Sequence, residues 1–226
     1  MPIKLEGPST TNQSGWGILY RARADEVSQA RPVFTGDVFA QGTLIVLQHP
    51  CALRVNGVNL AARLLVARVE SFPLVPLSRW KGNFRKMPLP ELWPSRLGEH
   101  FAADFVELDF ITSSDLELTE RVACLSQVGV NLLMQRWVHH NSRVIVPSHD
   151  FQVVTSGPFE EAELTEEWCE ERVLAGGDLA TSMSEAHAWI RADGGDGVSR
   201  QKLLEDPQRR SRVRLEMRQH LRSQVA

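Results

Sequence analysis

The sequence predicts an α+β fold, in which a small β-barrel with one packed helix is followed by a helical extension. Two kinds of pattern support this prediction. Residues 44–47 and 64–69 are short apolar runs bounded by turn residues, which is typical of buried strands. Residues 126–140 place Val, Leu and Trp at helical spacing after a capping serine, and the composition changes at 157–158 to a region rich in Glu and Arg.

Length and composition predict a globular, cytoplasmic protein. With 226 residues, of which 42% are hydrophobic and 23% charged, the chain can fill one compact domain with an appendage, or two small domains. No apolar run reaches signal-peptide or membrane-spanning length, so no membrane association is expected. Cys51, Cys124 and Cys169 show no Cys-x-x-Cys spacing, which favours reduced thiols. The net charge of −3 neither indicates nor excludes a polyanionic partner.

The barrel domain is expected to span residues 16–156. Residues 1–15, which are rich in Pro, Ser, Thr, Asn and Gly, are predicted to form a disordered leader before it. A turn at 35–37 leads into the first clear strand, and a second turn precedes the β-branched run that ends at Leu47. Pro50 ends that strand, because proline cannot donate a hydrogen bond to a ladder.

An Asn-Gly pair at 56–57 predicts a turn before the next strand, at 64–69. The segment 78–97 is then a long irregular insertion that contains three prolines, two tryptophans and a basic cluster. Loops of this length are uncommon without a role, which favours a binding loop. The alternative is a covering flap whose tryptophans, Trp80 and Trp93, seal one end of the barrel.

Residues 101–111 alternate between acidic and apolar side chains, which predicts a half-buried strand with an acidic outer face. Ser126 is expected to cap a helix that runs to about His140. Two short strands, at 143–147 and 151–154, are predicted to return the chain to the sheet.

The helical extension is expected at 157–226. Residues 160–171 contain seven glutamates and overlap an amphipathic helix predicted at 164–174. Two further helices are expected, the last of them beginning at Ser199. The tail from Arg200 carries eight Arg and Lys residues against three acidic ones. Such a tail can attract phosphates, but it lacks aromatic residues for stacking, and packing against the glutamates of the same molecule is the preferred interpretation.

The segment Gln48-His49-Pro50-Cys51 places side chains with chemistry at a strand end. His49 and Cys51 lie two residues apart on extended chain and share a face, so they can supply two ligands to a zinc ion that would need two more. Alternatively, they form a Cys–His nucleophile pair, which needs a third, orienting group. The simplest interpretation is structural, with Cys51 buried and His49 donating to a backbone carbonyl, so no metal is predicted.

Arg54 follows this segment and is a candidate phosphate ligand. A ribonuclease can use an arginine to stabilise developing charge and a second side chain to move the 2′-hydroxyl proton, and His49 can act as that acid or base. Lys81, Arg85 and Lys86 are candidates for contacts with a nucleic-acid backbone. Alternatively, these cations are surface charges that balance the acidic strand.

The Gly-Asp-Val turn at 36–38, the buried run at 44–47 and the helix start at 125–129 after an acidic strand resemble the MazF/PemK toxin family. That family has an SH3-like barrel with a C-terminal helix, and many of its members are dimeric endoribonucleases. The resemblance therefore implies an SH3-like barrel, RNA as a partner and a homodimer. The family places Arg-Pro between the turn and the buried strand, whereas Arg31-Pro32 precedes the turn here.

These observations predict a nucleic-acid-directed protein that binds or cleaves RNA, with His49 and Arg54 as catalytic residues and no cofactor. An alternative of another class is a non-catalytic interaction module. It would capture a protein partner through the tryptophan-rich loop and the basic C-terminal extension.

Overall fold

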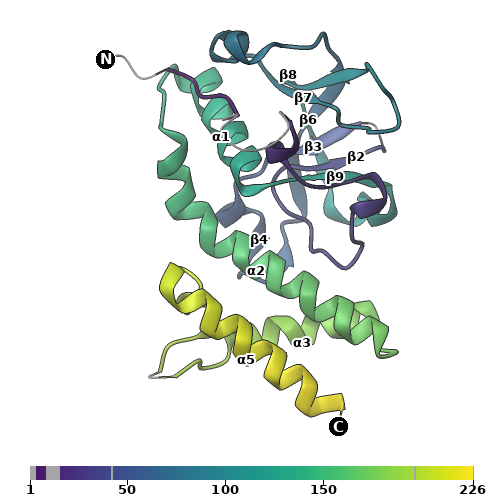
Figure 1. The fold of residues 1–226 in the computed structure, drawn as a ribbon, viewed down its shortest axis with the longest axis vertical. Coiled ribbons are helices and arrows are strands. Elements are labelled where there is room, and N and C mark those ends of the chain that lie inside the picture. Colours follow the sequence, from purple (N-terminus) through teal and green to yellow (C-terminus); the bar gives the residue numbers. More distant parts are fainter. Residues whose placement is uncertain (1–3, 9–15, 42, 196, 226) are drawn as a thin grey trace. The chain divides into compact units, whose positions relative to one another are not determined.

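The chain forms two compact units. The first, which we call the sheet unit, comprises the chain up to Val27 together with Val33–Val153. The second, the helical unit, comprises Ser28–Pro32 and the chain from Val154 onward. No helix in the described part of the chain has both the length and the apolar character needed to cross a bilayer. The computed structural model describes residues 4–8, 16–41, 43–195 and 197–225 (Figure 1).

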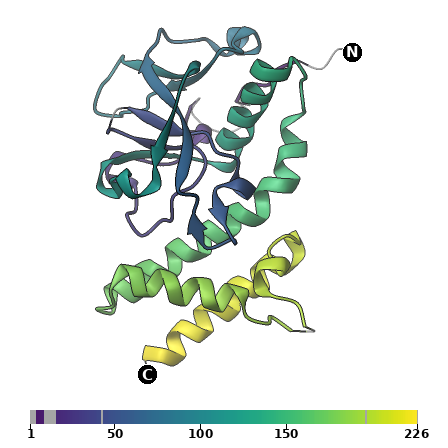
Figure 2. The ribbon, with the colours of Figure 1, turned by 180° about the vertical axis from the view of Figure 1, so that it is seen from behind.

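The sheet unit is built on one antiparallel sheet of seven strands in the order β1-β9-β2-β3-β6-β8-β7. Because β1 and β7 form its two ends, the curled sheet is a half-barrel (Figure 2). The predicted mixed α+β class is confirmed. The strands are β1 (Tyr20–Arg23), β2 (Asp37–Phe39), β3 (Leu44–Val46), β6 (Arg63–Ser71), β7 (Lys86–Pro90), β8 (His100–Thr112) and β9 (Arg121–Leu125), with β4 (Arg54–Val55) and β5 (Asn59–Leu60) as a separate pair.

Short 3₁₀ helices connect the strands, and α1 packs against β7, β9 and η1. The predicted helix after Ser126 is confirmed as α1 (Gln127–Ser142). The Ser126 hydroxyl accepts a hydrogen bond from the Gly129 N–H and so satisfies a donor of the first turn. The 3₁₀ helices are η1 (Gly17–Leu19), η2 (Ala24–Glu26), η3 (Pro50–Ala52), η4 (Leu77–Gly82), η5 (Ser113–Asp115) and η6 (Leu118–Glu120).

The burial of β8 and its pairing with neighbouring strands change along its length. Residues 101–105 are buried, and over this part the strand pairs with β6 on one side and β7 on the other. A bulge follows, where the pairing with β6 jumps from Asp104 to Leu108, and residues 106–110 are exposed. The half-buried alternation predicted for residues 101–111 is therefore wrong, because burial changes along the strand rather than from one face to the other.

The two strands predicted at 143–147 and 151–154 are wrong. Residues 151–154 lie instead in α2 (Ser148–Leu174), a helix of 27 residues. The reason is a partner from far away in the sequence: the Glu6 carboxylate accepts hydrogen bonds from both the N–H and the hydroxyl of Ser148. These bonds support the start of a helix over a β-branched run, which local propensity assigns to a strand.

The predicted disordered leader is also wrong for residues 4–8. Leu5 is buried, and the Glu6 N–H donates to Oε1 of Gln135 at 2.7 Å. Burial alone would raise the pKa of Glu6, but hydrogen bonds from Ser148 and Gln135 hold it below its ordinary value. The other residues of the 1–15 segment lie outside the described residues.

The helical unit contains α2 from Val154 onward with α3 (Leu179–Arg191), α4 (Arg200–Leu203) and α5 (Pro207–Val225). The boundary predicted between residues 156 and 157 falls inside α2, which continues through Pro158. The buried core of the unit draws on all four helices. Its members are Leu164, Trp168, Ala186, Trp189, Ile190, Leu203, Leu204, Val213, Met217 and Leu221.

Glutamates of α2 pair with arginines of α5 within the helical unit. Arg214 contacts Glu160 at 2.8 Å and Glu167 at 3.3 Å, and Arg218 contacts Glu167 at 2.5 Å. The basic tail therefore packs on the glutamates of the same molecule, as the preferred interpretation of the sequence expected.

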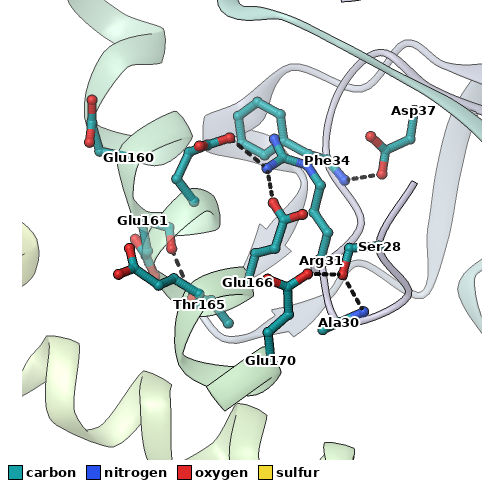
Figure 3. Close-up of polar contacts among 12 residues, drawn as sticks. Ser28, Ala30, Arg31, Phe34, Asp37, Glu160, Glu161, Thr165, Glu166 and Glu170 are labelled. Carbon is teal, nitrogen blue, oxygen red and sulfur yellow. Dashed lines mark hydrogen bonds and ion pairs between the residues drawn. The ribbon is translucent and has the colours of Figure 1, made fainter. Parts of the chain in front are cut away.

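The helical unit also includes a strap from the N-terminal part of the chain, Ser28–Pro32. Within this strap Arg31 is only 2% exposed, and its Nη1 lies 2.9 Å from the carboxylates of Glu163 and Glu166 (Figure 3). The hydroxyl of the first strap residue donates to Glu170 at 2.6 Å. The strap is thus fixed to α2 by ion pairing and hydrogen bonding.

Candidate functional site

His49 and Cys51 follow β3, where the chain leaves the sheet. The N–H of Gln48 donates to the Leu65 carbonyl of β6, and the chain then enters the 3₁₀ turn η3. Cys51 is exposed on this turn. The structural interpretation, which required a buried Cys51, is therefore wrong.

The structure brings the His49 ring and the Cys51 thiol together. His49 Nδ1 lies 2.7 Å from Cys51 Sγ and accepts a hydrogen bond from the Cys51 N–H at 3.2 Å. Burial lowers the pKa of His49, which favours a neutral imidazole able to accept the thiol proton. In the described part of the chain no group of three or more His, Cys, Asp or Glu side chains could hold a metal ion. Among these residues, His49 and Cys51 are therefore not joined by the two further ligands that the alternative zinc site needs.

Arg54 lies in the β4–β5 pair, and its guanidinium donates hydrogen bonds to backbone carbonyl groups. Nη1 donates to the Val58 carbonyl at 2.9 Å and Nη2 to the Val33 carbonyl at 3.0 Å. Neither bond involves His49. A guanidinium that donates to two carbonyl oxygens is poorly placed to receive a phosphate, so the geometry does not favour the predicted pairing of Arg54 with His49.

Of the three loop cations, Lys86 is held by carboxylates. Its Nζ lies 2.9 Å from Asp104 and also contacts Glu70. Burial alone would lower the pKa of Lys86, but the two carboxylates raise it above its ordinary value. Lys86 therefore neutralises its own neighbours, whereas Lys81 and Arg85 are exposed.

The loop cations and His49 lie at different points along β6. Gln48, next to His49, meets this strand at Leu65, whereas Lys86 meets it at Glu70. Five strand residues span about 17 Å. The predicted catalytic residues and the predicted backbone-binding cations therefore do not form one groove.

A second cluster of cationic and aromatic side chains forms where the loop before β7 meets the end of α1. We call this cluster the α1-end patch. The Arg143 guanidinium lies 5.2 Å from the centroid of the Phe84 ring, and Phe84 meets the His139 ring edge-on at 5.7 Å. Phe84, Arg85 and Arg143 are exposed. The members of the patch are Phe84, Arg85, His139, His140 and Arg143.

The end of α1 positions Arg143. This residue is the C-cap of the helix, with a left-handed backbone (φ 61°), and its N–H donates to the His139 carbonyl. The left-handed cap turns the chain out of the helix and ends it. Arg143 then lies over Phe84 while the histidines remain on the last helical turn.

The two exposed arginines, Arg85 and Arg143, make the patch electropositive, and they act on the neighbouring His140. Burial lowers the pKa of His140, and the charges of Arg143 and Arg85 lower it further, while Asp104 and a hydrogen bond with the Phe84 backbone oppose the shift. His140 is therefore neutral near pH 7. The positive charge of the patch comes from its two arginines.

Sequence reasoning found only part of this patch. It placed Arg85 among the candidates for nucleic-acid contact and His140 at the end of a helix, but it gave Phe84 and Arg143 no role. Phe84 and Arg143 are distant in the sequence, and the left-handed cap that joins them has no strong sequence signal. The sequence signal for this patch is the pair of histidines, His139 and His140, in the last turn of α1.

The tryptophans of the 78–97 insertion are packed. Trp80 is fully buried, stacks on Trp16 at 5.6 Å and donates to the Val75 carbonyl. Trp93 meets Phe101 edge-on at 4.4 Å. Both rings therefore pack within the sheet unit, as the covering interpretation expected, while Phe84 and Arg85 of the same insertion are exposed.

Comparison with known proteins identifies no relative. No family model, curated protein or solved structure matches this chain. Its function is therefore inferred from the side chains described above.

Proposed function

We propose that the protein binds single-stranded RNA through the α1-end patch. The observation that best supports this is the contact of Arg143 with the exposed Phe84 ring, next to Arg85. Exposed rings and guanidinium planes offer stacking surfaces to unpaired bases, and arginines attract the phosphates between them. The patch supplies both kinds of contact.

The proposal concerns binding rather than cleavage. Arg54, the predicted partner of His49 in catalysis, donates to backbone carbonyls instead. The half-barrel with its packed helix is compatible with the SH3-like barrel of the MazF/PemK toxins, and we propose that finer description for the sheet unit. Kinship with that family would favour RNA as the ligand. The cleavage of RNA with His49 as a catalytic residue stays a prediction.

The test is a fluorescence anisotropy titration with a labelled single-stranded RNA of about twelve mixed-sequence nucleotides. Arg143→Ala and Phe84→Ala are each expected to weaken binding by about tenfold, because loss of one stacking contact has an effect of this size. Arg143→Ala is also expected to make the plot of the log association constant against log salt concentration less steep by about 0.7, the value for one phosphate contact on a single strand.

The matched control is Arg222→Ala, which removes the same charge from an exposed position on α5. Its affinity for RNA is expected to equal that of the wild type. The proposal fails if the wild type does not bind, if Arg222→Ala weakens binding as much as Arg143→Ala, or if a duplex of the same sequence binds equally well.

Cleavage is examined with the same RNA on a denaturing gel. We expect the RNA to stay intact during incubation with the wild type. If it is cut by the wild type and spared by His49→Ala, the predicted catalytic role of His49 is correct and binding alone is too narrow a description.

A further inference from the structure

β8 has an open edge in the second half of its length. β7 pairs with β8 only over residues 100–104, and beyond the bulge β6 pairs with residues 108–112. Among the described residues, no strand pairs with this segment on the side away from β6. We call residues 106–112, the bulge residues Val106 and Glu107 included, the open edge.

The backbone groups of the open edge point away from the sheet at alternate residues. The Leu65 carbonyl of β6 accepts hydrogen bonds from the side of β3, and its N–H donates to the Gln48 side chain. Leu65 therefore exchanges no ladder bonds with Phe110, which lies opposite it on β8. By the same alternation, the N–H and C=O of Leu108 and Phe110 face the free side. The Phe110 N–H donates there to the adjacent Asp109 carboxylate at 2.7 Å.

The side chains of the open edge form two unlike rows. Val106, Leu108 and Phe110 are apolar yet 52%, 39% and 55% exposed. Glu107 and Asp109, which alternate with them, are exposed carboxylates. A strand with unpaired backbone groups and an exposed apolar row is a template for another strand.

The carboxylates argue against a second copy of this chain as the occupant. Antiparallel pairing of two open edges through Leu108 and Phe110 would place Asp109 of one copy opposite or diagonal to Asp109 or Glu107 of the other. Like charges at such positions destabilise a ladder. The same carboxylates favour a strand that carries Lys or Arg between apolar residues.

We propose that the open edge binds an extended segment of a protein partner in which apolar residues alternate with Lys or Arg. The partner backbone pairs with the outward-facing groups of Leu108 and the carbonyl of Phe110, which gives affinity. Its apolar side chains cover the exposed apolar row, and its cations meet Glu107 and Asp109, which gives specificity. This interaction is independent of RNA binding at the α1-end patch.

The test uses two capped peptides of about ten residues, one alternating Val with Lys and the other alternating Val with Glu. Isothermal titration calorimetry with the full chain is expected to show binding of the Val-Lys peptide at least about tenfold tighter, because two charge pairs change from attraction to repulsion. A Val-Lys peptide that is N-methylated on the amides facing the edge is expected to lose binding.

Variants of the chain locate the site. Leu108→Lys is expected to abolish binding of the Val-Lys peptide, and the double change Glu107→Lys with Asp109→Lys is expected to reverse the preference between the peptides. Val55→Lys, at another exposed apolar position, serves as the matched control and should bind as the wild type does. Thermal melts confirm that each variant is folded, since exposed substitutions cost little stability.

Several results would overturn the proposal. Equal binding of both peptides, binding of neither, or unchanged binding by Leu108→Lys would each exclude it. Retained binding of the N-methylated peptide would exclude strand pairing. A dimer in light scattering that Leu108→Lys dissociates would identify a second copy as the occupant instead.

Discussion

Glu6 joins three segments of the sheet unit through one carboxylate and its own backbone. The carboxylate accepts hydrogen bonds from Gln135 on α1 and from Ser148 at the start of α2. The Glu6 carbonyl accepts a further bond from Arg136, a buried arginine that also donates to the Trp80 carbonyl. Burial opposes the ionised carboxylate of Glu6, but the hydrogen bonds from Ser148 and Gln135 favour it and lower the pKa of Glu6.

This network predicts a pH-dependent contribution to stability. A carboxylate with a lowered folded-state pKa stabilises the fold above its unfolded-state pKa, and the contribution is lost as the pH falls through the folded-state value. Glu6→Gln is expected to cost about 1 to 3 kcal/mol at neutral pH, and its unfolding free energy should fall less on acidification than that of the wild type. Urea unfolding at a series of pH values measures both.

The control for this prediction is Glu107→Gln, which changes an exposed carboxylate. Its pH dependence is expected to follow the wild type. If Glu6→Gln also followed the wild type over the acidic range, the hydrogen bonds of Glu6 would not favour its ionised form.

At the scale of single residues, sequence spacing located candidate side chains better than it assigned their roles. The side chains of His49 and Cys51 are in contact as the sequence predicted, but the 3₁₀ turn η3 brings them together and not the extended chain that was expected. Arg54 and Arg143 are alike in chemistry, but one donates to backbone carbonyls and the other lies exposed on an aromatic ring. That difference depends on groups distant in the sequence, which local patterns do not contain.

At the scale of elements, Gly129 allows α1 to approach the N-terminal part of the sheet unit closely. A Cβ at this position would lie 2.3 Å from the Leu19 carbonyl oxygen of η1 and 3.1 Å from the Leu125 Cβ. Backbone oxygen atoms cannot yield as the end of a flexible side chain can. The residue is therefore required by packing rather than by an unusual backbone conformation.

Gly129→Ala is expected to destabilise the sheet unit by about 1 to 3 kcal/mol, because an added methyl group must displace η1 or α1. Thermal or urea unfolding measures the loss. Gly17→Ala is the matched control, since nothing lies within 4 Å of its added Cβ. An unchanged stability in Gly129→Ala would show that the contact between α1 and η1 can relax at little cost.

Elements marked by their own periodicity were predictable, and those determined by distant partners were not. The runs at β3 and β6 and the capped helix α1 follow from apolar spacing and turn residues. α2 does not follow from the local sequence, because its start is supported by Glu6 and its course includes Pro158. Local sequence signals, such as the Gly-Pro step at 157–158, favour the end of an element at a position where the helix α2 continues.

At the scale of the whole molecule, the helical unit is not a simple C-terminal extension. The sequence suggested a separable segment at 157–226, but the unit also contains the strap Ser28–Pro32. Nothing in those five residues indicates helical packing. Their place is determined by Arg31, whose guanidinium is buried against two carboxylates of α2.

Arg31→Ala is expected to destabilise the helical unit by about 3 to 5 kcal/mol, because it breaks a buried ion pair that holds the strap to α2. Denaturant unfolding followed by tryptophan fluorescence measures this, since Trp168 and Trp189 lie in the core of that unit. Arg222→Ala should change stability by no more than about 0.5 kcal/mol. Equal effects of the two substitutions would mean that the strap contributes little.

The strap also bears on how the protein matures on the ribosome. Arg31 and Glu163 are 132 residues apart, so at usual rates of synthesis the arginine emerges roughly 7 to 26 s before its partner. During that interval the strap is not yet packed on α2. Its principal contact residue, Arg31, is charged and well solvated by water, whereas an exposed apolar side chain in its place could aggregate. The strap can therefore reach its place only after α2 has emerged, and the core of the helical unit is complete only once α5 has followed.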